Sequence, residues 1–121
     1  MAYPYVPPAH NKFVTVMISD ISTAGQIYFV PGFRGKIKKI STALNGAIAT
    51  ADAVLTTKIA TVAVTGGGIT VATSGSAAGD IDTAIPTALN MFTESQAIEL
   101  ETDGASSNTV AIVATFELEP V

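Results

Sequence analysis

Cysteine and tryptophan are both absent from this chain of 121 residues. Without cysteine the protein can have no disulfide framework, no thiolate zinc site and no cysteine nucleophile. Long apolar runs are also missing. No segment approaches the roughly 20 apolar residues of a membrane-spanning helix, and the N-terminal residues contain no apolar run of signal-peptide length. These absences predict a soluble protein without a visible export signal.

Charge is scarce and unevenly distributed. Only 13% of the residues are charged, and the net charge is −4. All basic residues lie in the first half of the chain, whereas most acidic residues follow Thr61. The overall acidity argues against nucleic-acid binding, which needs a basic surface. A surface with so few charges indicates contact with another protein, and separate basic and acidic regions suit pairing with further copies of the chain.

The densest group of charges is basic. Arg34, Lys36, Lys38 and Lys39 follow one another closely. They form either a solvated strand edge that resists aggregation or a docking patch for an acidic neighbour.

Alternation between apolar and polar residues is the clearest pattern in the chain. Ile98 and Leu100 alternate with Glu99 and Glu101, and after a polar, glycine-containing break the alternation resumes over residues 110–118. The pattern predicts two strands with the glutamates in solvent, and the break favours a β-hairpin between them. A hairpin alone is marginally stable in water, so a second sheet is expected over its apolar face.

Short strands and frequent turns continue through the rest of the chain. We predict an all-β protein, an antiparallel β-sandwich of jelly-roll type with eight or nine strands, formed as one domain over residues 13–121. The strands outside the ambiguous stretch described next are expected at residues 13–19, 26–30, 53–61, 62–65, 69–73, 87–92, 96–102 and 108–119, with a long loop at 74–85.

One stretch of the sequence allows two interpretations. Ile37, Ile40 and Leu44 lie at helical spacing, which could indicate a helix. The same residues fit a strand if a β-bulge at Lys38 and Lys39 shifts the alternation by one residue. The all-β character of the surrounding sequence favours the bulged strand.

Residues 1–12 predict an extended arm. They contain half of the six prolines, and proline fixes φ and removes a hydrogen-bond donor. Tyr3, Tyr5 and Val6 could anchor this arm on a neighbouring molecule.

The first predicted strand has apolar residues on both faces. Val14, Val16 and Ile18 share one face, and Phe13 and Met17 share the other. Two apolar faces predict burial on both sides. The second face is therefore expected to lie beneath the arm or against another subunit.

Side chains that could carry chemistry are few and scattered. The only histidine, His10, lies in the arm, where a surface or partner contact is a commoner role than general base. Asp80 and Asp82 share strand parity and could bind a cation, although the spacing fixes no further ligand. The glycines at 66–68 lack the Lys-Ser/Thr ending of a phosphate-binding loop and predict a tight turn. We expect neither enzymatic activity nor a cofactor.

Several segments recur in the order found in one group of viral proteins. They are GKIKKI at residues 35–40, ADAVLT at 51–56, VTGGGITV at 64–71, GSAAGD at 75–80 and IELETDG at 98–104. Through these segments the chain from Gly35 to Pro120 resembles the small jelly-roll decoration (cement) proteins of tailed bacteriophage heads.

The resemblance implies a structural virion protein. Such proteins sit on the outer surface of the assembled capsid, commonly as homotrimers, and clamp neighbouring major capsid proteins. The implied partners are the major capsid protein and further copies of the chain, with no nucleic acid, membrane or small-molecule substrate. The implied location is the virion surface, after assembly in the cytoplasm of the bacterial host. The expected capsid or subunit contacts are Tyr3, Tyr5, Val6, Phe13, Met17, Arg34, Lys36, Lys38 and Val113.

A carbohydrate-binding jelly roll for host attachment is the alternative function. Such modules commonly use exposed aromatic platforms. The chain has no tryptophan and three tyrosines, of which only Tyr28 lies outside the arm. An enzyme ranks third, because no catalytic set of residues is visible.

Overall fold

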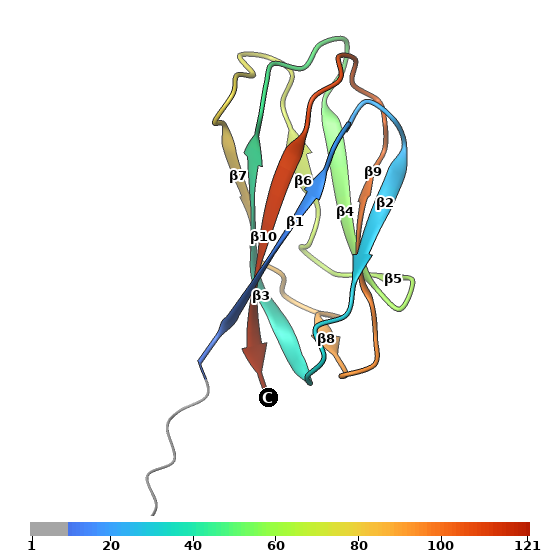
Figure 1. Ribbon diagram of the computed structural model, residues 1–121, viewed down its shortest axis with the longest axis vertical. Coiled ribbons are helices and arrows are strands. Elements are labelled where there is room, and N and C mark those ends of the chain that lie inside the picture. The colour runs from blue at the N-terminus through green and yellow to red at the C-terminus, as the bar shows by residue number, and fades with distance from the viewer. Residues whose placement is uncertain (1–9) are drawn as a thin grey trace, which may run out of the picture.

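The computed structural model describes residues 10–121, which form two antiparallel β-sheets packed face to face (Figure 1). The predicted all-β sandwich is therefore confirmed. The strands are β1 (Lys12–Ile18), β2 (Gly25–Phe29), β3 (Gly35–Leu44), β4 (Ala53–Ile59), β5 (Val62–Ala63), β6 (Ile69–Val71), β7 (Ile81–Ala84), β8 (Met91–Phe92), β9 (Ile98–Thr102) and β10 (Ile112–Pro120). None of the described residues belongs to a helix that could span a membrane.

The order of strand pairing is that of a jelly roll. β1 pairs with β10, β2 with β9, β3 with β7 and β8, and β4 with β5 and β6, so the first four strands pair with the later ones in reverse order. Sheet A has the order β1-β10-β3-β7, and sheet B has the order β2-β9-β4-β5; β8 also pairs with β3, and β6 with β4. One long antiparallel ribbon folded back on itself produces this arrangement.

The predicted hairpin between β9 and β10 is wrong. β9 lies in sheet B between β2 and β4, whereas β10 lies in sheet A between β1 and β3. Both strands point their apolar residues inward, including Leu100 on β9 and Ile112 on β10. Period-two alternation shows which side chains face the core but not which strand lies alongside. Two strands on opposite sheets therefore carry the same pattern as a hairpin.

β3 is the bulged strand that the sequence favours, and the helix interpretation is wrong. The register between β10 and β3 shifts between Glu117 and Leu118, which leaves one extra residue on β3 beside Lys38. The bulge allows Ile37 and Ile40 both to face the core, although three positions separate them.

Part of the predicted long loop is a strand. Residues 81–84 form β7, which pairs with β3 at the edge of sheet A, and the loop ends at Asp80. The predicted strand at 87–92 is reduced to β8. β7 escapes sequence analysis because four residues rich in Asp, Thr and Ala, next to a Gly/Ser/Ala-rich loop, give too short an alternation to recognise.

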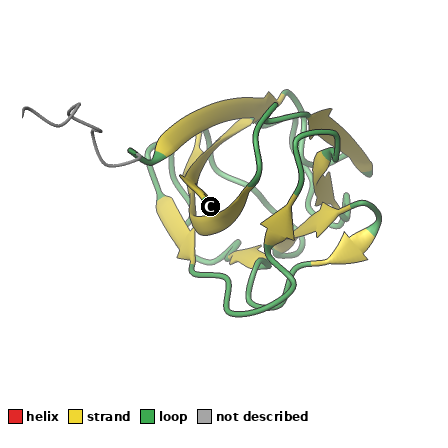
Figure 2. Cartoon of the chain, turned by 90° about the horizontal axis from the view of Figure 1, so that it is seen from below, coloured by secondary structure: helices red, strands yellow, loops and turns green. Residues whose placement is uncertain are grey.

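The hydrophobic core fills the space between the sheets, which surround it when the molecule is seen from below (Figure 2). Phe116 from β10 and Phe29 from β2 meet across this space with ring centroids 5.1 Å apart. Phe33 and Phe92 form a second pair, with ring centroids 5.6 Å apart. The inward faces thus close a complete core, and the outward faces are left to determine what the protein binds.

Candidate binding surfaces

An apolar row crosses the outward face of sheet A. Met17 on β1 lies beside Val113 on β10, which lies beside Ala43 on β3, and Ala43 lies beside Ile81 on β7. The ends of the row are open, since Met17 is 54% exposed and Ile81 is 73% exposed. The structure therefore brings together two predicted contact residues, Met17 and Val113, and adds two that the sequence did not reveal.

A row of hydroxyl groups follows the apolar row. Thr15, Thr115, Ser41 and Thr83 occupy registered positions on β1, β10, β3 and β7. The hydroxyls of Thr15 and Thr115 are 3.1 Å apart and share a hydrogen bond. This row is polar but uncharged, so it can be desolvated at lower cost than a charged row.

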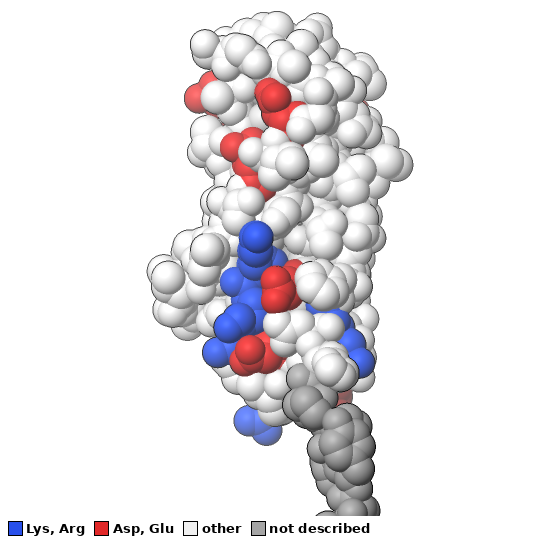
Figure 3. Space-filling view, turned by 90° about the vertical axis from the view of Figure 1, so that its left-hand side faces the viewer, with Lys and Arg blue, Asp and Glu red and all other residues white. Residues whose placement is uncertain are grey.

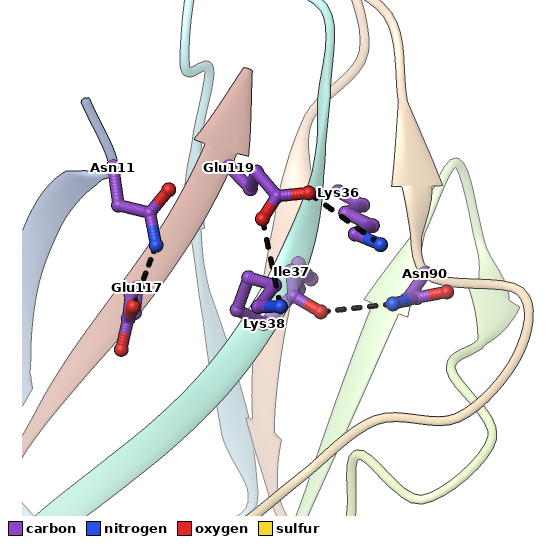
Figure 4. Close-up of polar contacts among 7 residues, drawn as sticks. All are labelled: Asn11, Lys36, Ile37, Lys38, Asn90, Glu117 and Glu119. Atoms are coloured by element: carbon purple, nitrogen blue, oxygen red, sulfur yellow. Dashed lines mark hydrogen bonds and ion pairs between the residues drawn. The ribbon is translucent and has the colours of Figure 1, made fainter. Parts of the chain in front are cut away.

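The third row contains charge. Phe13, which is 65% exposed, lies beside Glu117 on β10, and Glu117 lies beside Lys39 on β3. The Asn11 side-chain amide donates a 2.7 Å hydrogen bond to the Glu117 carboxylate, as Figure 4 shows. Both faces of β1 are apolar as predicted, but residues 10–121 of the chain leave the Phe13 and Met17 face open.

The predicted basic residues lie at the same end of the molecule as the start of β1. Figure 3 shows the basic side chains clustered in this half, around acidic ones. Glu119 accepts contacts from two of them, with its carboxylate oxygens 3.5 Å from Lys36 Nζ and 3.5 Å from Lys38 Nζ (Figure 4). Arg34 is exposed nearby on the chain. Solvent screens pairs this exposed, so the cluster contributes little to stability and stays available to a partner.

An apolar groove lies beside the basic cluster and was not predicted. Lys36 pairs in register with Met91, which lines this groove of about 400 Å³. Its other lining residues are Ile59, Ala60, Val62, Leu89 and Gln96. They come from three separate turns, so no local sequence pattern indicates them.

The opposite end of the molecule carries all five aspartates. They lie in or beside the loops that follow β1, β3, β6 and β9, at residues Asp20, Asp52, Asp80, Asp82 and Asp103. Most of these carboxylates bind loop backbone: Asp52 accepts from the Thr73 N–H, and Asp103 accepts from the N–H groups of Val54 and Ala105. These acids therefore have a structural role in tying the loops together.

The suggested cation site does not assemble. The Asp80 carboxylate accepts a 2.9 Å hydrogen bond from the Ala77 N–H. Among residues 10–121, no group of three or more His, Asp or Glu side chains is placed to hold a metal ion. Asp80 thus closes its own turn, as an Asx-type contact does.

Glu99 is not the solvated acid that alternation predicts. It faces outward from sheet B but is only 6% exposed, because it lies between Tyr28 on β2 and Lys58 on β4. Glu101 is partly exposed and its carboxylate lies 3.4 Å from Lys58 Nζ. The central strand of a sheet is covered by side chains from both neighbours, which alternation alone does not reveal.

Asp20 makes the fold sensitive to acid. Hydrogen bonds from the Ser22 side chain, the Ser22 backbone and Thr23 lower the pKa of the Asp20 carboxyl from its usual 3.8. A lowered folded-state pKa adds stability that is present above pH 3.8 and is lost as the pH falls through the folded value. We expect Asp20→Asn to be less stable than the wild type at neutral pH, with the difference shrinking below pH 3.8 in urea unfolding. A difference that stays constant with pH would contradict this assignment.

The remaining predicted contacts fall elsewhere. Tyr3, Tyr5 and Val6 lie outside the described residues. His10 is exposed just before β1. Neither the comparison with protein-family models nor the search of curated proteins finds a match to this chain.

Proposed function

We propose that the protein is a structural virion protein that decorates and stabilises the outer surface of a bacteriophage capsid. It clamps neighbouring major capsid proteins and acts as a homotrimer. The proposal is supported by the resemblance to decoration proteins and, above all, by the apolar row on a sandwich whose core is already complete. A surface of this kind serves adhesion.

The basic end supports the same function. Arg34, Lys36 and Lys38 lie near the apolar groove at Met91 and near the start of β1. Apolar area with a basic rim suits an acidic, partly apolar protein surface such as a neighbouring capsid subunit. In a trimer, three such contacts act together with a high effective concentration, so weak single contacts can hold firmly.

The direct test is binding to heads assembled without this chain. We expect purified protein to co-sediment with DNA-filled heads and not with unexpanded precursor shells of the same phage. Failure to bind either particle would contradict the proposed function. Light scattering tests the trimer separately, and a strictly monomeric species both in solution and on the shell would exclude it.

The predicted contact role of the arm has its own test. Deleting residues 2–9 leaves Asn11, and with it the hydrogen bond to Glu117, in place. We expect the deletion to lower head binding by about tenfold or more, because it removes two tyrosines and a valine from the contact. Gln26→Ser, on the exposed outward side of sheet B, is the matched control and should bind as the wild type. Unchanged binding by the deletion would exclude an arm contact.

A carbohydrate-binding module is the second candidate. It is favoured by Tyr28, which is exposed on the outward face of sheet B beside Glu99. An aromatic ring next to a carboxylate is a common way to hold a sugar. Glycan-array binding that is lost in Tyr28→Ala, together with no binding to heads, would support this function over capsid decoration.

A further inference from the structure

The outward face of sheet A is complementary to itself. Consider a two-fold axis that runs along the strands, between the central strands β10 and β3. It places β10 of one copy over β3 of the other and β1 over β7, and it keeps every residue at the same height along the strands. Each row of side chains then faces the same row of the second copy, which is the arrangement of an isologous contact.

The uncharged rows match under this symmetry. Met17 faces Ile81 of the second copy, and Val113 faces its Ala43, so the apolar row covers an apolar row. In the next row, Thr115 faces Ser41 of the second copy, so hydroxyl groups meet hydroxyl groups. No apolar side chain in these two rows is placed against a charge.

The charged row matches as well. Glu117 faces Lys39 of the second copy, and Lys39 faces its Glu117, which gives two ion pairs in each contact. The Glu117 carboxylate is already oriented by Asn11, and Lys39 has no ion-pair partner within residues 10–121. Complementary charge of this kind fixes register as well as partner.

The alternative two-fold axis, directed across the strands through the hydroxyl row, does not match. It lays each strand over its own copy and exchanges the apolar row with the charged row. Val113 then faces Glu117, and Ala43 faces Lys39, so that apolar groups desolvate charges that have no partner.

We propose that the protein self-associates through the outward face of sheet A, with a second copy related by the two-fold axis along the strands. Four strands about 4.8 Å apart and three rows about 6.8 Å apart give a contact of roughly 400 Å² per copy. Stable interfaces bury about 800 Å² per partner, so this contact is weak and transient in solution. It goes beyond the proposed function, because it needs no capsid.

The test uses charge reversal in trans. Lys39→Glu and Glu117→Lys each create two like-charged pairs in a contact between identical copies. We expect each variant to self-associate about tenfold more weakly than the wild type in sedimentation equilibrium at concentrations up to about 1 mM. An equimolar mixture of the two variants restores unlike pairs and is expected to recover association. Wild-type-like association of Lys39→Glu, no recovery in the mixture, or no concentration dependence for the wild type would each overturn the proposal.

Cross-linking tests the symmetry itself, because the chain has no native cysteine. A short bismaleimide should join Met17→Cys to Ile81→Cys when the two variants are mixed, and should not join Met17→Cys to itself, since β1 lies over β7 and not over β1. Efficient cross-linking of Met17→Cys alone, or equal cross-linking of Met17→Cys to Gln26→Cys on sheet B, would overturn the proposal. Neither experiment contains heads, so failure of pairing and failure of capsid decoration are distinguishable.

Discussion

Gly104→Ala is expected to lower the free energy of unfolding by about 2–5 kcal/mol. Gly104 follows β9 with φ +68°, a left-handed conformation that costs an L-residue about 1–2 kcal/mol. A Cβ at this position would also collide with the backbone of Ala24 and approach the Thr23 carbonyl carbon to 3.0 Å. Overpacking against backbone adds about 1–3 kcal/mol. Denaturant unfolding of the purified domain measures the sum.

Gly75→Ala is the control that separates the two causes. Gly75 has nearly the same φ, +72°, but a Cβ there meets nothing within 4 Å. It should therefore show only the conformational cost, about 1–2 kcal/mol. Equal losses for the two variants would mean that the loops after β1 and β9 are not packed against each other at Gly104.

These loops are joined by more than close packing. The Thr102 hydroxyl donates a 3.0 Å hydrogen bond to the Ile21 carbonyl, and the Ile21 N–H donates to the Val110 carbonyl at 3.0 Å. The backbone groups at this end are thereby satisfied, as buried polar groups must be. Loss of the Gly104 contact consequently reaches the ends of β2 and β10, which lie in different sheets.

Local sequence predicted much of the fold. The bulge in β3 was recognisable because Ile37 and Ile40 can share one face of a strand only if one residue is added between them. Strand partners were not recognisable. β9 and β10 have the pattern of a hairpin but lie in opposite sheets, since pairing depends on how the whole ribbon folds back.

The candidate surface was predicted only at one edge. Phe13, Met17 and Val113 were identifiable because they interrupt an otherwise polar outer face. Ala43 and Ile81 complete the row, yet neither has a local signal, and the strand that carries Ile81 was interpreted as loop. A surface formed across four strands becomes visible only when their registers are known.

The symmetry of the proposed pairing is compatible with decoration of a shell. Two-fold axes of an icosahedral shell point outward and lie between neighbouring three-fold positions, so a contact of this kind would join adjacent trimers. The strands would then stand upright, with one end toward the shell. The basic residues and the apolar groove lie at the end opposite the aspartate-rich loops, which makes that end the expected contact with capsid protein.

Phe116→Ala is the second large effect that we expect, a loss of about 3–5 kcal/mol in the free energy of unfolding. Phe116 lies on the central strand β10, is fully buried, and contacts Phe29 of the opposite sheet with a centroid distance of 5.1 Å. Its removal leaves a cavity between the sheets. A small domain is stable by only about 5–15 kcal/mol in total, so the variant should unfold at a much lower denaturant concentration.

Phe13→Ala is the matched control, because it removes the same ring from the outward face of the neighbouring strand. Phe13 is 65% exposed, so the free energy of unfolding should change by less than about 1 kcal/mol. Its effect should appear in binding instead, since Phe13 adjoins Glu117 on the pairing face. Comparable destabilisation by the two variants would mean that the outward face of β1 is covered within the folded chain. A large loss for Phe116→Ala alone would show that folding and adhesion use opposite faces of the same sheet.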